Sequence, residues 1–242
     1  MQTDVHWKDT FIIQYTGYTT DKSKGAILSH RNVMHNAAQA TAVNSFKKSH
    51  ETLLSAFLMF HIAGHANAII SGIQGGKIIL EPDARDTDFI QDQLQKSLAN
   101  VIIGLPALFD IMVSNIAFAA LNFTKLIVVV SGTATLTHGS YDALPVIIGE
   151  NKIPDEFGMT ETAPCYIANP PKRYKLGSIG FLLLNAKMKI RDDEIDNHDI
   201  PFGESGEIIC TGPQVMKGYL NLLNESGKHC VKLTANVVIF WR

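Results

Sequence analysis

The sequence predicts an α/β fold, in which a mostly parallel sheet with flanking helices is followed by a small antiparallel β subdomain. From Thr10 to about Phe157, short apolar runs alternate with amphipathic segments of helical length, a pattern typical of βαβ units. Several runs are apolar throughout, as expected for strands covered on both faces. After Pro170 the runs are short and separated by Gly, Pro, Asp and Asn. We therefore expect an α/β domain over residues 1–170 and a β-rich domain over residues 171–242.

Six runs in the first part have the length and composition of strands. They are Phe11–Tyr15, Leu53–Met59, Lys77–Leu80, Asn100–Ile103, Leu126–Val130 and Ile153–Phe157. Four helices are predicted between them from the residues at which they begin. Side-chain oxygens can cap three of these helices, and a proline fits the first turn of the other. The predicted helices run from Ser29 to about Val43, from Asp86 through Leu98, from Pro106 through Met112, and from Thr137 toward Ile148.

The second part contains three further strand-like runs, with little helical periodicity between them. They are Ile179–Leu184, Lys187–Arg191 and Glu207–Cys210. The segment Asn236–Trp241 has the same apolar pattern and stops at Arg242 without a polar tail. An apolar edge strand invites aggregation, so a domain rarely ends on one.

The composition excludes several classes of protein. Of the 242 residues, 46% are apolar and 18% are charged, so a sizeable core is available and wholesale disorder is excluded. The length fits one large domain or two modest ones. The chain has 21 basic and 23 acidic side chains, and no run of Lys or Arg forms a basic stripe. We therefore expect no nucleic-acid partner.

The sequence also predicts a cytoplasmic protein without a transmembrane segment. Residues 1–9 are polar and lack the apolar segment of a signal peptide. The most apolar stretch, Val101–Val113, is interrupted by a proline and an aspartate and is too short to span a membrane. The three cysteines, Cys165, Cys210 and Cys230, are widely spaced and odd in number, which is typical of reduced thiols.

The stretch Tyr15–Gly25 has the clearest chemical character. It reads Y-T-G-Y-T-T-D-K-S-K-G directly after a predicted strand. Hydroxyls and backbone N–H groups can donate to a polyphosphate, and Lys24 supplies positive charge. A Walker A loop is excluded, because its two glycines would fall at Thr16 and Asp21. On composition alone, a solvated turn remains the favoured alternative.

The stretch Glu156–Thr162 reads E-F-G-M-T-E-T. Its aromatic residue could stack a base, its glycine could admit a phosphate and its second carboxylate could hold Mg²⁺. Taken alone, the pattern is a weak signal, and a chain leaving a strand for a loop is the favoured alternative. The stretch Gly203–Asn221 predicts a strand between two glycine-bearing turns and has no chemistry of its own.

The stretch Phe60–His65 reads F-H-I-A-G-H and places His61 and His65 four residues apart, on one face of a helix. A metalloprotease motif would need a glutamate at Ile62, so that class is excluded. Packed histidines, or histidines that line a site, are favoured over a zinc pair.

Together, and in this order, these stretches resemble the adenylate-forming superfamily, and within it the fatty-acyl-CoA synthetases. The family's phosphate loop, Y-T-S-G-T-T-G-x-P-K-G followed by L-S-H-x-N, is similar to residues 15–32. Its F-H-x-x-G element is similar to residues 60–64 and its S-G-G-A adenine segment to residues 131–134. Its Y-G-M-T-E motif is similar to residues 157–161, with Phe replacing Tyr. Its G-E-x-G-E-I…G-P-x-V-M-x-G-Y motif is similar to residues 203–221.

The resemblance implies a ligase that joins a carboxylic acid to ATP, releases pyrophosphate and then passes the acyl group to coenzyme A. ATP, Mg²⁺ and CoA are the implied cofactors and co-substrates. A fatty acid is the expected substrate, with an aryl acid as the alternative. All of these partners are small molecules.

The resemblance also implies the residues of the site, position by position. The implied catalytic residues are Thr160, Glu161 and Lys24, with Glu161 as the Mg²⁺ ligand. The implied nucleotide-binding residues are Thr16, Gly17, Thr19, Thr20, Lys24, Gly25, Gly132, Thr133, Ala134, Phe157, Gly158, Met159, Thr160 and Asn236. The implied substrate pocket contains His61, Gly132 and Gly158.

Several positions depart from the family pattern. Tyr18 and Asp21 replace glycines of the phosphate loop, and Asp21 brings a negative charge toward the polyphosphate. Thr133 and Thr135 replace the second glycine and the proline of the adenine segment. Asn236 replaces the carboxylate of the family's ribose-binding T-G-D motif, and an amide oxygen is a weaker acceptor.

By this resemblance we expect the chain to be the middle of a longer enzyme. The family's mobile C-terminal domain, which brings the adenylation lysine, and the N-terminal part of its large domain have no counterpart in the sequence. One hypothesis is a synthetase core that works only with a complementary chain or as a homo-oligomer. The other is a decayed, non-catalytic homologue with at most weak nucleotide or acyl binding. In both, the chain alone is expected to bind ATP weakly and to lack activity.

Overall fold

The computed structural model describes most of the chain. The described residues are 4–16, 23–83, 85–96, 98–150, 152–171, 173, 178–192, 198–200, 206–222 and 231–233. Contacts divide the chain into two compact units, which are described separately below. The first contains Met1–Gln39, Gly158–Tyr166 and Leu182–Arg242, and the second contains Ala40–Phe157 and Ile167–Phe181. Neither unit is continuous in sequence, so the expected division at residue 170 stays a prediction.

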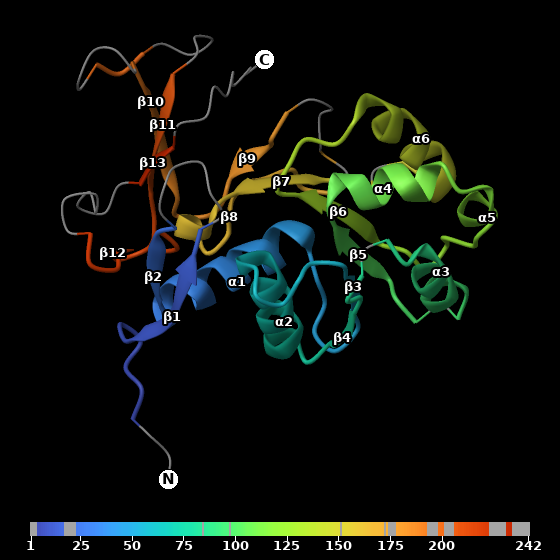
Figure 1. The fold of residues 1–242 in the computed structure, drawn as a ribbon, viewed down its shortest axis with the longest axis horizontal. Coiled ribbons are helices and arrows are strands. Elements are labelled where there is room, and N and C mark those ends of the chain that lie inside the picture. Colours follow the sequence, from blue (N-terminus) through green and yellow to red (C-terminus); the bar gives the residue numbers. More distant parts are fainter. Residues whose placement is uncertain are drawn as a thin grey trace. The chain divides into compact units, whose positions relative to one another are not determined.

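A mostly parallel sheet is the centre of the second unit, and it confirms the predicted fold class (Figure 1). Its strands lie in the order β4-β3-β5-β6-β7-β8-β9. The pairs from β4 to β7 are all parallel. The strands are β3 (Thr52–Ser55), β4 (Lys77–Leu80), β5 (Val101–Gly104), β6 (Val128–Gly132), β7 (Asp155–Gly158), β8 (Cys165–Ala168) and β9 (Phe181–Leu182).

Helices lie between the strands, and those that begin near Asp86, Pro106 and Thr137 were predicted. Asp86 accepts a hydrogen bond from the Phe89 N–H at 3.0 Å, and Thr137 accepts one from the Ser140 N–H at 3.3 Å. Pro106 occupies the first turn of its helix. The helices are α2 (Ile62–Gln74), α3 (Thr87–Gln95), α4 (Pro106–Val113), α5 (Ile116–Ala119) and α6 (His138–Ile148). No helix of the described chain is both long and apolar enough to cross a membrane.

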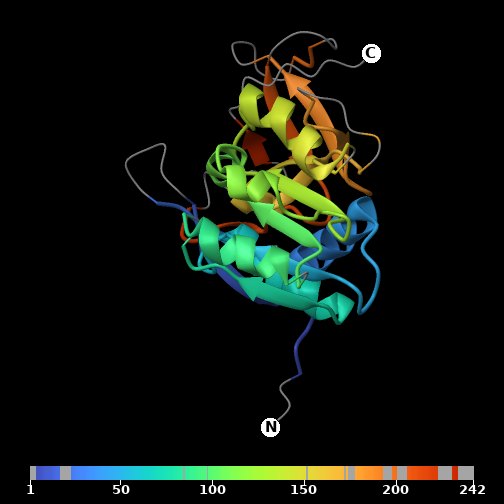
Figure 2. The same cartoon turned by 90° about the vertical axis from the view of Figure 1, so that its right-hand side faces the viewer.

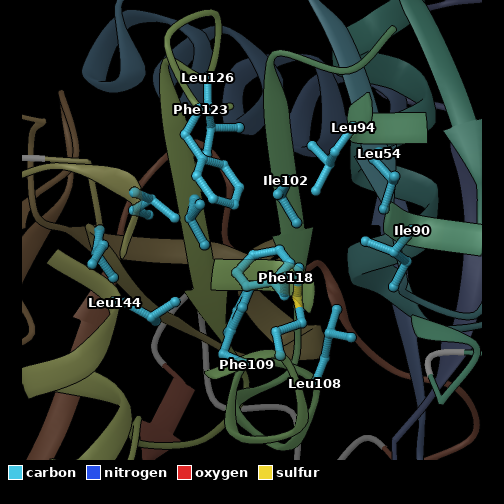
Figure 3. Close-up of a cluster of buried hydrophobic side chains, with 14 of the residues drawn as sticks. Leu54, Ile90, Leu94, Ile102, Leu108, Phe109, Phe118, Phe123, Leu126 and Leu144 are labelled. Carbon is cyan, nitrogen blue, oxygen red and sulfur yellow. The ribbon is translucent and has the colours of Figure 1, made fainter. Parts of the chain in front are cut away.

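The main core lies between the sheet and helices α3–α6 (Figure 3). Leu54, Ile102 and Val129 are register partners on adjacent strands, so their side chains form one apolar row across the sheet. On the opposite face, Asn67 of α2 donates to Ser55 Oγ at 3.0 Å. Alternate residues of a strand point to opposite faces, so helices cover both sides of the sheet (Figures 1 and 2). Burial on both faces explains why the strands are apolar throughout.

The first unit is built from two small antiparallel sheets. One has the order β1-β2-β12 and joins β1 (Thr10–Tyr15), β2 (Gly25–Ser29) and β12 (Gly218–Tyr219). The other has the order β10-β11-β13 and joins β10 (Lys187–Arg191), β11 (Glu207–Thr211) and β13 (Val231–Leu233). The antiparallel pairing predicted for the second part of the chain is confirmed. Pairing of β12 with the first hairpin was not predicted.

Helix α1 (His30–Asn44) begins in the first unit, at the predicted cap. Ser29 Oγ accepts a hydrogen bond from the Asn32 N–H at 3.2 Å, while Asn32 Oδ1 accepts one from the Ser29 N–H at 2.8 Å. These reciprocal bonds satisfy two N–H groups that the helix itself leaves without partners.

A stripe of buried amides then follows one face of α1, and we call Asn32, Asn36 and Gln39 the amide stripe. Asn32 Nδ2 donates to the carbonyls of Pro213 and Val215 at 2.8 and 2.7 Å. Both polar atoms of the Asn36 amide bond the backbone of Cys165, and Gln39 Nε2 donates to the carbonyl of Leu184. The stripe therefore satisfies backbone groups from three separate segments.

Some predicted boundaries are wrong. The strand predicted over Leu53–Met59 ends at Ser55, and its last apolar residues, Leu58 and Met59, are exposed in the turn before α2. Strands β2 and β8 were not predicted, and both are defined by the strands beside them in the fold. The pattern Asn236–Trp241 lies outside the described residues.

The amide stripe gives a first prediction. Replacement Asn36→Ala leaves the N–H and carbonyl of Cys165 buried without their partner, so we expect the free energy of unfolding to fall by about 2–4 kcal/mol. Urea denaturation measures this change. His35→Ala, at an exposed position of the same helix, is the control and should stay within about 0.5 kcal/mol of wild type. Equal effects of the two replacements would contradict the role given to the stripe.

Candidate functional site

The candidate residues lie in both units, so two groups are described separately. The phosphate-side group lies in the first unit and contains Thr16, Lys24, Gly25, Gly158, Met159, Thr160 and Glu161. The adenine-side group lies in the second unit and contains His61, Gly132, Thr133, Ala134 and Phe157. Four predicted site residues lie outside the described residues: Gly17, Thr19, Thr20 and Asn236.

The β1–β2 hairpin brings Thr16 and Lys24 together. The Thr16 N–H donates to the Lys24 carbonyl at 2.9 Å, and Ser23 Oγ donates to the Thr16 carbonyl at 3.3 Å. Gly25 is the register partner of Tyr15, and a Cβ at Gly25 would lie 2.9 Å from Ile13 Cγ2. A side chain at residue 25 would therefore have to displace Ile13 within the hairpin, a constraint that the motif alone does not show.

A tight turn presents Thr160 and Glu161. The turn is the 3-10 helix η1 (Thr160–Thr162), which directly follows β7. A Cβ at Gly158 would lie 2.0 Å from the Pro164 carbonyl oxygen, so only glycine fits there. Thr162 is fully buried, and its Oγ1 accepts a hydrogen bond from the Met159 N–H at 3.1 Å. The predicted site residues Gly158 and Met159 thus shape the turn, and Thr162 closes it.

Glu161 is buried, with 5% of its surface exposed, and it is bonded to residues of the last motif. The Tyr219 hydroxyl donates to Glu161 Oε1 at 2.7 Å, and the Met216 N–H donates to the Glu161 carbonyl at 2.8 Å. The Lys24 ammonium lies 5.4 Å from the centroid of the Tyr219 ring, within the range of a cation–π interaction. Tyr219 therefore contacts both charged residues of the phosphate-side group. The sequence does not predict this role of Tyr219. The G-Y dipeptide at the end of the last motif is the only signal that points to this residue.

The donor set of this group fits a magnesium ion held jointly with phosphate. Among the described residues, no three His, Cys, Asp or Glu side chains cluster closely enough to hold a metal by themselves. Proteins commonly bind Mg²⁺ through one or two carboxylates, with phosphate and water completing the shell. Glu161 meets this requirement, because its hydrogen-bond donor Tyr219 is an uncharged hydroxyl rather than a competing cation.

In the adenine-side group, His61 and Gly132 both lie near Phe57. The rings of Phe57 and His61 stack, with centroids 6.1 Å apart and planes inclined by 15°. A Cβ at Gly132 would be 3.9 Å from both Phe57 Cζ and the Glu156 carbonyl oxygen. The end of β6 therefore comes close to the apolar ring beneath His61.

The expected placement of His61 and His65 on one helix face needs correction. His61 precedes α2 as its cap, and its Nδ1 accepts a hydrogen bond from the Ala63 N–H at 3.1 Å. Burial of the ring lowers the pKa of His61 below its usual value, which favours the neutral imidazole that this bond requires. A neutral imidazole has only one nitrogen with an available lone pair, and the capping bond uses it. A metal pair would have needed that lone pair.

The backbone reverses at Thr133, directly after β6. Thr133 has a φ of +72°, in the left-handed region that β-branched residues rarely adopt. Thr133 and Ala134 are both exposed. The threonine thus keeps a conformation that suits glycine, at the position where the family pattern has glycine.

Phe157 lies near the end of β7, next to two partly buried acidic residues of the same strand, Asp155 and Glu156. Asn44 Nδ2 donates to Glu156 Oε1 at 2.8 Å. Asp155 Oδ1 and Ser131 Oγ are buried without a hydrogen-bond partner among the described residues, and the two residues are register partners. Burial raises the pKa of Asp155 to about 6.

The family described as AMP-binding enzyme matches residues 1–220 of the chain. The chain belongs to this family. The predicted membership of the adenylate-forming superfamily is therefore confirmed. The motifs that carried the resemblance begin at Tyr15 and fall within the matched range, except for Asn221, the last residue of the final motif, which lies just beyond it.

Curated relatives are CoA ligases. A long-chain-fatty-acid–CoA ligase from Yersinia pestis is 32% identical over 220 residues, which are 89% of this chain and 39% of that protein. The 4-coumarate–CoA ligase 3 of Oryza sativa subsp. japonica is 27% identical over 226 residues, 90% of this chain and 41% of that protein. The chain thus spans about two-fifths of the length of the curated relatives it matches.

Solved structures share the fold. ATP-bound MatB from Rhodopseudomonas palustris superposes with a TM-score of 0.83 at 26% identity, over 93% of this chain and 44% of that one. A long-chain-fatty-acid-CoA ligase from Archaeoglobus fulgidus superposes with a TM-score of 0.81 at 23% identity, over 90% of this chain and 45% of that one. The second likeness is evidence of the fold alone.

The strained residue of this AMP-binding chain gives a second prediction. Replacement Thr133→Gly should remove about 1–2 kcal/mol of left-handed strain and lose part of that in backbone entropy, so stability rises by about 1 kcal/mol. Thr135→Gly is the matched control. Thr135 has no positive φ to relieve, so its replacement should lower stability by about 0.5–1 kcal/mol. Urea midpoints that fall for both variants would contradict the strain at Thr133.

Asp155 gives a third prediction, on pH. Its folded pKa of about 6 lies above the unfolded value of about 3.9, so the folded state binds the proton more tightly between these values. Stability attributable to this group is therefore present at about pH 4 and is lost as the pH rises through 6. Asp155→Asn should match wild type at about pH 4 and exceed it by about 1–2 kcal/mol at pH 7.5, after allowance for solvent screening. A difference that does not change with pH would contradict the assignment.

Proposed function

We propose that the chain provides the nucleotide-handling core of an acid–CoA ligase. In this reaction ATP activates a carboxylic acid with release of pyrophosphate, and the acyl group then passes to CoA. The observation that carries the proposal is the pairing of the buried Glu161 carboxylate and the Lys24 ammonium on one tyrosine side chain, within a chain of the AMP-binding family. A carboxylate for Mg²⁺ and a cation for phosphate are the charges that this chemistry requires.

The phosphate-side group has a proposed division of roles. Lys24, at the base of the β1–β2 hairpin, would neutralise phosphate charge, and Thr160 on η1 would meet the α-phosphate. Thr19 and Thr20 would donate to the β- and γ-phosphates. Glu161 would share Mg²⁺ with the phosphates, and the ion would neutralise charge on the transferring group. Catalysis then consists of positioning and charge stabilisation, without covalent chemistry by the protein.

The adenine-side group would bind the base and the acid. Phe157 and the loop of Gly132 and Ala134 would bracket adenine, and Asn236 would bond the ribose. His61, held neutral and stacked on Phe57, would line the acid site without neutralising the substrate carboxylate. A neutral imidazole suits this place, because a cation would stabilise the free carboxylate and reduce its nucleophilicity.

A long-chain fatty acid is the proposed substrate, supported by the 32% identity to a long-chain-fatty-acid–CoA ligase. The likeness to a 4-coumarate–CoA ligase at 27% identity supports an aryl acid as the alternative. The cytoplasm is the proposed location, because three widely spaced cysteines are typical of reduced thiols.

The second candidate function is a non-catalytic homologue that retains weak nucleotide or acyl binding. It is supported by the strained threonine at position 133 and by the replaced phosphate-loop glycines at Tyr18 and Asp21. From the resemblance to the family, we propose that turnover requires a complementary chain or a second copy. Alone, it should bind ATP weakly and give negligible exchange of pyrophosphate into ATP.

A titration of the purified chain with ATP, with Mg²⁺ or with EDTA, gives the fourth prediction. Lys24→Met should weaken ATP binding about tenfold or more in both conditions, because a charge-assisted bond contributes about 1.5–3 kcal/mol. Glu161→Gln should abolish only the gain in affinity that Mg²⁺ provides. Lys125→Met and Glu150→Gln, both at exposed positions of the second unit, are the matched controls and should bind as wild type does.

The outcomes separate the two candidate functions. ATP binding that is strengthened by Mg²⁺ and lost in these two variants supports a ligase core. No heat from ATP and no stabilisation by an acyl ligand supports a homologue without nucleotide function. Pyrophosphate exchange that depends on added fatty acid would contradict the proposed inactivity of the isolated chain.

A further inference from the structure

Tyr219 contacts two residues of opposite charge, Glu161 and Lys24. Its hydroxyl donates to Glu161 Oε1 at 2.7 Å, and the face of its ring lies 5.4 Å from Lys24 Nζ. One contact uses the hydroxyl and the other uses the face of the ring, so both are made by one rigid side chain. A tyrosine side chain has two rotatable bonds, so fixing it costs little conformational entropy.

The backbone fixes Tyr219 from both sides. In β12 it is the register partner of Ala26, and the Lys217 and Leu220 N–H groups donate to the β2 carbonyls of Ile27 and Gly25 at 2.9 and 2.8 Å. On the side of η1, the Met216 N–H donates to the Glu161 carbonyl. The segment 216–220 is thereby bonded to the strand that follows Lys24 and to the turn that carries Glu161.

Neither contact with Tyr219 is an ion pair. A direct ion pair between a lysine and a glutamate would neutralise each partner and would compete with phosphate for the ammonium and with Mg²⁺ for the carboxylate. A hydroxyl donor and an aromatic face orient the same two groups without neutralising either. The hydroxyl also occupies one carboxylate oxygen and leaves the second for a further ligand.

We propose that Tyr219 is a positioning residue, which holds the Glu161 carboxylate for the metal and the Lys24 ammonium for the phosphates at a fixed separation. The inference rests on the proposed function, since it assigns ligands to these two groups. It makes separate predictions for the two ends of the side chain. The hydroxyl acts on the metal-dependent part of nucleotide binding, and the ring acts on the metal-independent part.

The fifth prediction compares two replacements of Tyr219 by calorimetric titration with ATP, in Mg²⁺ and in EDTA. Tyr219→Phe keeps the ring and removes the hydroxyl. Affinity for ATP in EDTA should stay within about twofold of wild type, while the gain in affinity that Mg²⁺ provides should fall by about tenfold. Tyr219→Leu also removes the ring face, and its affinity in EDTA should fall by a further factor of about 3–10.

Tyr166→Phe is the matched control. The Tyr166 hydroxyl, in the same unit, is bonded to the backbone of Lys187 and Thr211 and has no contact with Glu161. Its removal should lower the urea midpoint while leaving the gain from Mg²⁺ unchanged. If Tyr219→Leu does not fold, Tyr219→Phe and this control carry the test.

Each outcome decides between the proposals. A gain from Mg²⁺ that is present in wild type and unchanged in Tyr219→Phe overturns the positioning role and leaves the proposed function standing. Equal losses in Tyr219→Phe and Tyr166→Phe show a general effect on folding and also overturn it. No gain from Mg²⁺ in wild type overturns the proposed function, and the positioning role with it.

Discussion

The first unit depends on the amide stripe of α1. Loops and short strands cannot pair all of their own peptide groups, and a buried donor or acceptor without a partner costs about 1–3 kcal/mol. Asn32, Asn36 and Gln39 supply those partners to backbone near residues 165, 184 and 213–215. Three polar side chains at helical spacing thus do what a longer sheet would otherwise do. An apolar residue at any of the three positions would suit the helix and leave these segments without partners.

The same stripe sets the geometry of the phosphate-side group. Cys165 follows η1 after three residues, and Val215 precedes β12 by three, so Asn36 and Asn32 hold the backbone next to Glu161 and Tyr219 respectively. Glu161 and Tyr219 are 58 residues apart in sequence and are hydrogen-bonded in the fold. Their bond forms because both segments are bonded to one helix. The charged residues of the site are therefore positioned by uncharged ones.

What the sequence predicts is local, and what it misses depends on contacts between distant segments. Asp86, Thr137 and Pro106 act within one helical turn, so the starts of their helices follow from the residues themselves. Strands β2 and β8 are no shorter than β4 and β5, which the sequence predicts, but they depend on the strands beside them. The motifs located Lys24 and Glu161, but no local pattern shows that a tyrosine joins them or that His61 caps a helix.

Thr133 shows that a glycine of the family pattern can be replaced while the backbone keeps a conformation that suits glycine. The family pattern has glycine at this position, and glycine adopts a positive φ without strain. Here threonine adopts a φ of +72°, a conformation that costs about 1–2 kcal/mol, because β6 is held in register with β7 and the chain must turn directly afterwards. The backbone path is therefore set by the sheet rather than by the residue. A substitution in such a loop reduces stability before it changes the shape of the loop, so the loss of glycine at residue 133 weakens the fold of this loop while its path is kept.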